Sequence, residues 1–444
     1  MTSESVIDGE PATIRARVPD HTSLLAQRFH ERVSTSLWFV PGLFVVGAFL
    51  ASRGLTWLDQ THPIQRHSGL LLGIDPADSA VVTSTVATAM LTFIAVVFST
   101  TLVAVQVAAS QYSPRIVRLF VRSRVVHLSL GVFLATFVFS LNALVVSHSS
   151  GRGYVPVRTL AVTYLLVAAT LLTFVLFVHS MVRLLRVQYL LATVTALTRP
   201  VLRLEFPGDD AYRSVPTPSS APQSLLRCPA GTAGVVQAMD LTALASLAAA
   251  QGCWIDVQVR VGQYLGGGSP LAEVHGPGAS SIDAAQILRH ILVGGERTFL
   301  QDAGFGIRQL TDTANRALSP AINDPTTACQ AIDRITDLLA SIAGSPDPSG
   351  WYLDGNGAAR VRRDDPTVTD LCQLGFTEII HYGADAPQVI RRLLASLDLL
   401  EDLASVQHVG EIRSLRLTLT EVASLAIPTP LQDTASRPDG LGLG

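Results

Sequence analysis

The sequence of 444 residues contains no lysine, so all 32 of its basic residues are arginine. Without a lysine amine the chain cannot form a Schiff base, use a P-loop lysine, or carry biotin or lipoate. The absence therefore excludes several large classes of enzyme and carrier protein.

Acidic residues are missing from a long stretch of the first half. No Asp or Glu lies between Asp78 and Glu205, although ten arginines do. Charged residues make up 15% of the chain, against about 25% in ordinary soluble domains. The deficit is typical of membrane spans. We expect no carboxylate within a span, which disfavours a proton- or sodium-coupled transporter.

Cysteine is scarce, and the four residues lie far apart: Cys228, Cys253, Cys329 and Cys372. None forms a pair with metal-binding or redox spacing, so we interpret them as reduced core residues. We expect neither a metal nor a cofactor. The polar N-terminal segment also lacks the apolar core of a cleaved signal peptide.

Four long apolar runs dominate the first half: Leu37–Leu58, Val81–Ser110, Val125–Val146 and Leu160–Met181. About 20 apolar residues suffice to cross a bilayer as a helix. The sequence therefore predicts a multi-pass protein of the bacterial inner membrane, with the transmembrane domain at 36–186 after an N-terminal segment at 1–35.

Arginines are distributed unequally between the two sides of these spans. The N-terminal segment, the second loop and the segment after the last span hold twelve, whereas the other two loops hold four. Because cytoplasmic loops are enriched in arginine, we expect both termini to be cytoplasmic.

The second run carries polar residues at helical spacing: Ser84, Thr88, Thr92, Ser99 and Gln106. Small hydroxylated stripes allow helices to pack closely and to form hydrogen bonds across an interface. The stripe is therefore interpreted either as a packing surface or as the lining of a conduit.

An arginine collar follows this run, and its members are Arg115, Arg118, Arg122 and Arg124. One interpretation is a positively charged inner mouth, which would concentrate anions. The other is an interfacial or positive-inside loop that contacts anionic lipid.

The second half predicts a mainly α protein with one small β-rich unit. A helical extension with a Pro/Ser-rich linker is expected at 187–226, a β-rich unit at 227–278, a helical domain at 279–427 and a disordered tail at 428–444. The string VGQYLGGGSPLAEV is similar to the turn and strand of barrel-sandwich domains. The missing lysine rules out their carrier function.

Apolar periodicity predicts six helices in the helical domain: Ile282–Leu300, Asp302–Ala317, Thr326–Ala343, Val368–Tyr382, Ala386–Ser405 and Val409–Leu425. The intervening segment with GSPDPSG, DGNG and RRDDP is expected to be a loop.

Charged and polar residues concentrate around the second and third of these helices: Arg297, Asp302, Arg308, Asp312, Arg316, Asn323 and Asp324. Arg308, Asp312 and Arg316 follow one another at i,i+4 spacing, which favours ion pairs on one helix face. Asn323-Asp324-Pro325 has the pattern of a helix cap. A structural corner or subunit contact, a ligand site, and a catalytic site all remain open, although no histidine lies between His290 and His381.

Three strings together resemble a large bacterial family of predicted membrane proteins labelled domain of unknown function 2254: SQYSPRIVRLF, GERTFLQDAGFGIRQLTD and RALSPAINDPTTA. The resemblance extends over about Phe29 to Ala426. It implies four spans followed by a soluble region, and it implies no catalytic role.

These observations favour an oligomeric, channel-like conduit for small ions with an anion-leaning inner mouth. The alternative is a membrane-anchored cytoplasmic scaffold or sensor without transport or catalysis. An enzyme is not expected, because no catalytic constellation is visible. The expected partners are the lipid bilayer, including anionic lipid, and further copies of the chain; nucleic acid is not expected.

Overall fold

The computed structural model describes residues 39–62, 76–111, 123–149, 157–207, 218 and 222–439. They divide into two compact units on either side of the Leu190–Leu191 bond. We call them the membrane unit, which ends at Leu190, and the C-terminal unit, which begins at Leu191.

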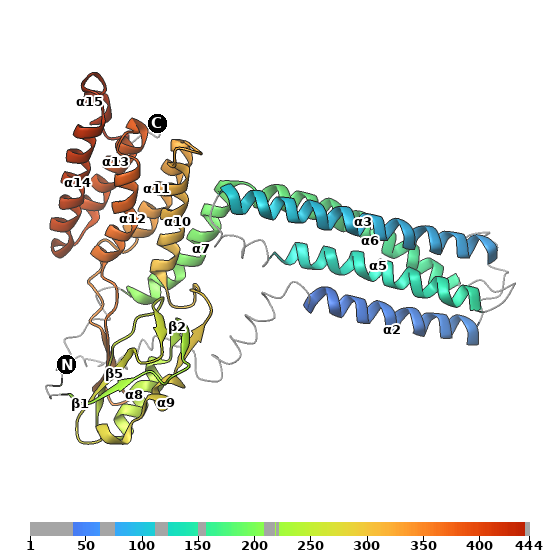
Figure 1. Cartoon of the computed structure of the whole chain (residues 1–444), viewed down its shortest axis with the longest axis horizontal. Helices are drawn as coiled ribbons and strands as arrows, with labels where there is room; N and C mark the ends of the chain where they lie inside the picture. Colours follow the sequence, from blue (N-terminus) through green and yellow to red (C-terminus); the bar gives the residue numbers. More distant parts are fainter. Residues whose placement is uncertain are drawn as a thin grey trace, which may run out of the picture. The chain divides into compact units, whose positions relative to one another are not determined.

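Four long helices form the membrane unit: α2 (Phe39–Thr61), α3 (Pro76–Gln111), α5 (Arg124–Ser149) and α6 (Val157–Leu184). Figure 1 shows them running alongside one another. The segments that are long and apolar enough to cross a membrane are Phe39–Thr61, Ala80–Val107, Arg124–Val145 and Val157–Arg183. The prediction of four spans is confirmed.

Helix α5 is the centre of this unit. Half of its most apolar window is buried, against 17–22% for the other three spans. Phe133 of α5 is fully buried and packs edge-to-face on Phe93 of α3 and Phe177 of α6, with ring centroids 5.0 and 6.3 Å apart. Aromatic packing of this kind fills the space where the helices meet.

Two small sheets lie in the C-terminal unit. Their strands are β1 (Pro222–Arg227), β2 (Ala233–Met239), β3 (Trp254–Val257), β4 (Tyr264–Gly266), β5 (Pro270–His275), β6 (Ile291–Gly294), β7 (Trp351–Leu353) and β8 (Ala359–Arg363). The larger sheet has the order β1-β5-β3-β8-β7, and the smaller has the order β4-β2-β6. Only the β3–β8 pair is parallel among these described strands, with Ile255 opposite Val361.

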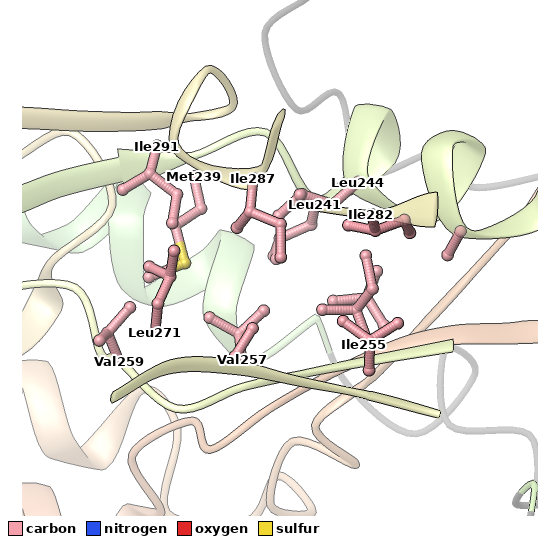
Figure 2. Packing of buried hydrophobic residues seen from close by; sticks show 14 of the residues in the cluster. Met239, Leu241, Leu244, Ile255, Val257, Val259, Leu271, Ile282, Ile287 and Ile291 are labelled. Carbon is pink, nitrogen blue, oxygen red and sulfur yellow. The ribbon is translucent and has the colours of Figure 1, made fainter. Parts of the chain in front are cut away.

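Apolar side chains from both sheets and from helix α8 (Leu241–Ala250) form one core. Figure 2 shows Leu244 of α8 and Ile287 of α9 (Ala284–Leu288) above Ile255 and Val257 of β3. Leu244, Ile255 and Ile287 are fully buried. The period-two pattern of the strands and the short apolar helix therefore fold onto each other as one hydrophobic cluster.

The remaining helices are α7 (Val187–Glu205), α10 (Ala303–Ala317), α11 (Pro325–Ala340), α12 (Val368–Tyr382), α13 (Pro387–Leu403), α14 (Val406–Ala426) and α15 (Thr429–Ala435). Helix α11 is typical: Ala328, Ile332, Ile335 and Leu339 are buried at spacings of three and four residues. The mainly helical fold with a small β-containing part is confirmed.

Three predictions in this region are wrong. The expected helix Ile282–Leu300 is instead α9 followed by strand β6, which pairs with β2. The expected loop before α12 contains β7 and β8. The expected disordered tail contains α15, whose neighbour Ile427 and terminal residue Ala435 are buried. Strands β1, β6, β7 and β8 also show that the sheets use residues from outside 227–278.

Candidate functional site

The hydroxylated face of α3 is turned away from the other helices of the unit. Thr88, Thr92, Ser99 and Gln106 are exposed and Ser84 is half-buried, whereas Ala87, Met90, Val97 and Ala104 are buried. At about 100° per residue, the two sets are centred roughly 160° apart around the helix. The stripe therefore lies opposite the face that packs on α5 and α6.

Hydroxyl groups along this helix bond to their own backbone. Thr92 donates to the carbonyl of Thr88 at 3.4 Å, and Thr100 donates to that of Val96 at 2.9 Å. Such bonds reduce the cost of placing a hydroxyl in an apolar environment. The exposed stripe is therefore compatible with lipid, with another protein surface, or with water.

The arginine collar lies mostly outside the described residues, which begin again at Ser123. Arg115, Arg118 and Arg122 are in the interval from 112 to 122. Arg124 is the first residue of α5, and it is exposed.

A carboxylate does lie within a span, contrary to the sequence-based expectation. Helix α2 continues past Leu58 to Thr61, and this extension contains Asp59, whose side chain is 3% exposed. Arg158 of α6 approaches it with an Nη1–Oδ1 distance of 3.3 Å. Thr159 donates to Oδ2 both from its backbone N–H at 3.1 Å and from its hydroxyl at 2.9 Å.

Asp59 acts as the cap of a helix that follows it by almost 100 positions. The N–H groups in the first turn of α6 have no partner within that helix, and they attract negative charge. Arg158 also donates to the carbonyls of Leu58 and His62, at 3.3 and 2.8 Å. The site therefore ties the end of the first span to the start of the last. The negative charge of Asp59 is paired with the positive charge of Arg158, which indicates a structural contact between α2 and α6.

The interior of the membrane unit also contains hydroxyl pairs between helices. Thr136 of α5 and Thr170 of α6 lie 2.9 Å apart, and both are buried. Ser129 donates to the carbonyl of Thr173 at 3.2 Å. These bonds resemble the polar contacts that hold membrane helices together.

The seven residues that the sequence places around the second and third predicted helices form three separate groups in the structure. They lie on one face of α10, at its N-terminal end, and in the turn between α10 and α11. Arg308 pairs with Asp312 at 2.7 Å and with Glu378 of α12 at 2.5 Å. Asn315 donates to the other oxygen of Glu378 at 2.8 Å. These contacts fasten α10 to α12, and they hold the pKa of Glu378 below its usual value, chiefly through the bond from Arg308. Arg316 lies in the last turn of α10.

The α10–α11 turn is built by Asn323 and Asp324. Asn323 has a φ of +49°, a left-handed conformation that Asn tolerates better than most residues. Asp324 caps α11 through bonds from the backbone N–H of Thr327 at 3.0 Å and its hydroxyl at 2.6 Å. Asn323 and Asp324 therefore form the turn that joins α10 to α11.

Arg297 and Asp302 lie at the opposite end of α10. Two parallel bonds of 2.8 Å join the guanidinium to the carboxylate, and Asp302 also caps α10 through the N–H of Phe305 at 2.8 Å. The Ala303 N–H faces Glu205 Oε1 at 3.4 Å, so the last residue of α7 joins this group.

Glu205 belongs to a buried charged cluster that sequence reasoning did not identify. We call it the Glu205 cluster; it comprises Glu205, Arg297, Asp302, Tyr352, Arg363 and Asp365. Arg363 is 8% exposed and pairs with Asp365, while Tyr352 donates to Asp365 at 2.7 Å. Burial raises the pKa of Glu205 to about 8; Arg363 and the Ala303 N–H oppose this increase, and Asp302 and Asp365 add to it.

Ser405, His408 and Asp347 have the composition of a hydrolase triad. Ser405 Oγ lies 2.9 Å from His408 Nδ1, and Asp347 Oδ1 lies 3.1 Å from His408 Nε2. However, His408 is 1% exposed, and its Nδ1 also lies 3.3 Å from the carbonyl of Ala343. Asp347 in addition accepts from the N–H of Val368 at 2.9 Å. This group fastens the loop after α11 to the starts of α12 and α14.

A polar hollow of about 340 Å³ lies at the end of β3, lined by Asp256, Val257, Gln258, Arg260, Gln263, Arg362 and Asp364. Its charges pair with one another, because Arg260 contacts Asp364 and Arg362 lies 3.5 Å from Asp256. Within the described part of the chain, no group of three or more His, Cys, Asp or Glu side chains is placed to hold a metal ion.

Comparison with known proteins places these features in one family. A family described as predicted membrane protein (DUF2254) matches residues 34–398. The chain is 32% identical over 330 residues to the uncharacterized proteins Rv1290c of Mycobacterium tuberculosis and Mb1321c of Mycobacterium bovis, which covers 72% of this chain and 63% of each relative. It thus spans less than two thirds of the length of these curated relatives. No solved structure matches. The chain belongs to the DUF2254 family of predicted membrane proteins.

Proposed function

We propose that the protein forms a homo-oligomeric, channel-like conduit for small ions in which α3 of each copy faces the conduit. The orientation of α3 is the observation that carries the proposal. Its hydroxyl stripe is exposed on the single chain, on the side opposite its packing face. An oligomer that turns this face inward would supply a polar lining from residues that lie opposite the packing face of α3.

The packing of the single bundle supports a path between copies. The ring centroid of Phe93 lies 5.0 Å from the ring centroids of both Phe133 and Phe174, and Phe177 packs on Phe133 in the same cluster. These rings occupy the meeting point of α3, α5 and α6. A conduit of this kind would have both termini cytoplasmic and the arginine collar at its inner mouth, where positive charge favours anions.

Cysteine accessibility tests the proposal in the full chain reconstituted into liposomes. The native cysteines are buried, so single cysteines at Thr88, Thr92 and Ser99 can be introduced into a cysteine-free background. We expect water-soluble thiol reagents to modify them and to reduce ion flux by more than half. Leu172 of α6 is 65% exposed and serves as a lipid-facing control that should not react.

Charge reversal tests the selectivity of the conduit. Arg115→Glu and Arg118→Glu should shift the reversal potential toward cations, because the sign of the inner mouth is partly reversed. Inert cysteines on α3 together with ion-tight liposomes would refute the conduit.

A membrane-anchored scaffold or sensor is the second candidate. The observation that favours it is the C-terminal unit, which contains more than half of the chain and folds around its own core. Under this alternative the stripe on α3 would be a packing surface between copies or with lipid.

A further inference from the structure

We infer that Arg183 and Arg186, at the junction of α6 and α7, bind the phosphate group of an anionic lipid whose acyl chain lies along an exposed apolar face of α6. Arg183 lies in the last turn of α6, Arg186 directly precedes α7, and both side chains are exposed. The inference goes beyond the conduit and does not depend on it, because the hydroxyl stripe on α3 takes no part in this site.

The length of α6 places Arg183 at the depth of the lipid headgroups. The segment of α6 that is apolar enough to cross a membrane runs from Val157 to Arg183. From Arg158 to Arg183 the helix is about 37 Å long, at a rise of 1.5 Å per residue. A bilayer measures about 40–45 Å with its headgroups and about 30 Å without them. The two arginines therefore reach the headgroup layers on opposite sides of the bilayer.

An exposed apolar stripe on α6 leads directly to this arginine. Leu171, Val175, Val178 and Val182 are exposed, and their spacing of three and four residues puts them on one face of the helix. An acyl chain that packs on this stripe would bring its phosphate group next to Arg183. Inorganic phosphate has no apolar part to place there, so the stripe favours a lipid as the source of the phosphate.

The break between α6 and α7 keeps the two arginines close in the chain. The N–H of Arg186 donates to the carbonyl of Arg183 at 3.1 Å, and the carbonyl of Arg186 accepts from the N–H of Leu190 at 3.3 Å. The first turn of α7 contains no acidic residue. A guanidinium group can donate two parallel hydrogen bonds to a phosphate, so neighbouring arginines suit this ligand.

No carboxylate in the described part of the membrane unit offsets these charges. Its acidic residues are Asp59, which ends α2 and pairs with Arg158, and Asp78, which begins α3. Figure 1 shows both of these helix ends at the end of the bundle where α6 begins. Neither Arg183 nor Arg186 forms an ion pair among the described residues. An anion that neutralises them can come from the bilayer.

The start of α5 adds a third positive charge at a similar depth. Ser129 of α5 donates to the carbonyl of Thr173 of α6 at 3.2 Å, and α5 runs antiparallel to α6. In this register Arg124 lies within about 8 Å of Arg183 along the bundle axis. Arg124 is exposed, and it raises the positive potential around the site. The inference itself depends on Arg183 and Arg186.

Quenching by brominated lipids tests the inference in the full-length protein in nanodiscs. Val182→Cys in a cysteine-free background carries a fluorophore next to Arg183. Brominated phosphatidylglycerol and brominated phosphatidylcholine are compared at equal mole fraction, and quenching gives the ratio of their binding constants. Attraction of anionic lipid to one arginine near the surface is worth about fivefold in affinity. We therefore expect a ratio of at least about 25 in favour of phosphatidylglycerol.

Removal of the two charges should abolish most of this preference. Arg183→Gln together with Arg186→Gln should lower the ratio about 25-fold, and each single change should lower it about fivefold. Equal binding of the two lipids by the protein with native arginines, or an unchanged ratio in the double variant, would overturn the inference. If the double variant does not fold, the single variants decide: a fivefold decrease in each supports the inference, and no decrease in either refutes it.

Arg53→Gln is the matched control, since it removes an exposed arginine of α2 near the opposite end of the bundle. It should leave the ratio unchanged, and an equal decrease would show a general effect of charge instead of a site. Replacement of chloride by inorganic phosphate at constant ionic strength separates the two sources of phosphate. The ratio should again stay the same, whereas its loss would show that the site binds free phosphate and would overturn the assignment to lipid.

Discussion

The two units bury polar groups in different ways. In the membrane unit several buried hydroxyls bond to a backbone carbonyl of their own helix, as Thr163 does to Thr159 at 2.9 Å. In the C-terminal unit, ionised side chains connect elements far apart in sequence, as Arg308 connects α10 to Glu378 of α12. Both units satisfy helix hydroxyls locally, and the C-terminal unit in addition uses many ionised side chains as cross-links between its elements.

Asp59 breaks this pattern, because it is a charged cross-link at the edge of the membrane unit. Its partners Arg158 and Thr159 begin α6, where the unpaired N–H groups of the first turn need an acceptor. The carboxylate of Asp59 is tolerated at this position because it accepts from three donor groups that would otherwise need water: the Arg158 guanidinium, the Thr159 N–H and the Thr159 hydroxyl.

The largest predicted effect concerns Asp59→Ala. Removal of the acid leaves Arg158 without its counter-ion and the first turn of α6 without its cap, which should cost about 3 kcal/mol. A thermal melt of the purified full-length protein in detergent measures the loss. Asp59→Asn, which keeps an acceptor oxygen, should be less damaging. If Asp59→Ala melts like wild type, the cross-link does not contribute to stability.

A smaller effect is expected for Asp324→Ala. This change removes a cap within the first turn of α11, whereas Asp59 caps a helix almost 100 positions away. Loss of the two bonds to Thr327 should lower the stability of the C-terminal unit by about 1–2 kcal/mol. Differential scanning calorimetry of the full chain provides the measurement. Asp433→Ala removes an exposed ion pair with Arg437 and should stay within about 0.5 kcal/mol of wild type. Equal effects of the two changes would contradict the role assigned to the cap.

The smallest effects distinguish the inner from the outer hydroxyls of the membrane unit. Thr136→Val removes a buried bond to Thr170 between α5 and α6, so it should cost about 0.6 kcal/mol. Thr92→Val lies on the exposed face of α3, so it should change stability by less than about 0.5 kcal/mol. Chemical denaturation in mixed micelles measures both. A reversed order would show that the face of α3 is the more important packing surface.

Features carried by local periodicity were predictable from the sequence. The four spans were placed within a few residues, because an apolar run long enough to cross a bilayer is a strong signal by itself. Helix α11 begins at Pro325, one residue before its expected start, because Asp324-Pro325 has the pattern of a cap and first turn.

Features that depend on distant partners were not predictable. Strand β8 reads as a polar loop because of its arginines, and it becomes a strand by pairing with β3, about 100 positions earlier. The end of α2 similarly contacts Arg158, almost 100 positions later. Glu205 has no local feature that separates it from other acids. Its special environment arises from Arg363, Asp302 and Asp365, which the fold brings together.

The cross-link between Asp59 and Arg158 has a consequence for biosynthesis. Ribosomes deliver α2 to the membrane well before α6, since almost 100 residues separate the two partners. Until α6 arrives, the carboxylate at the end of α2 lacks its counter-ion and must remain hydrated. The cross-link between the first and last spans can therefore form only after the last span has been made.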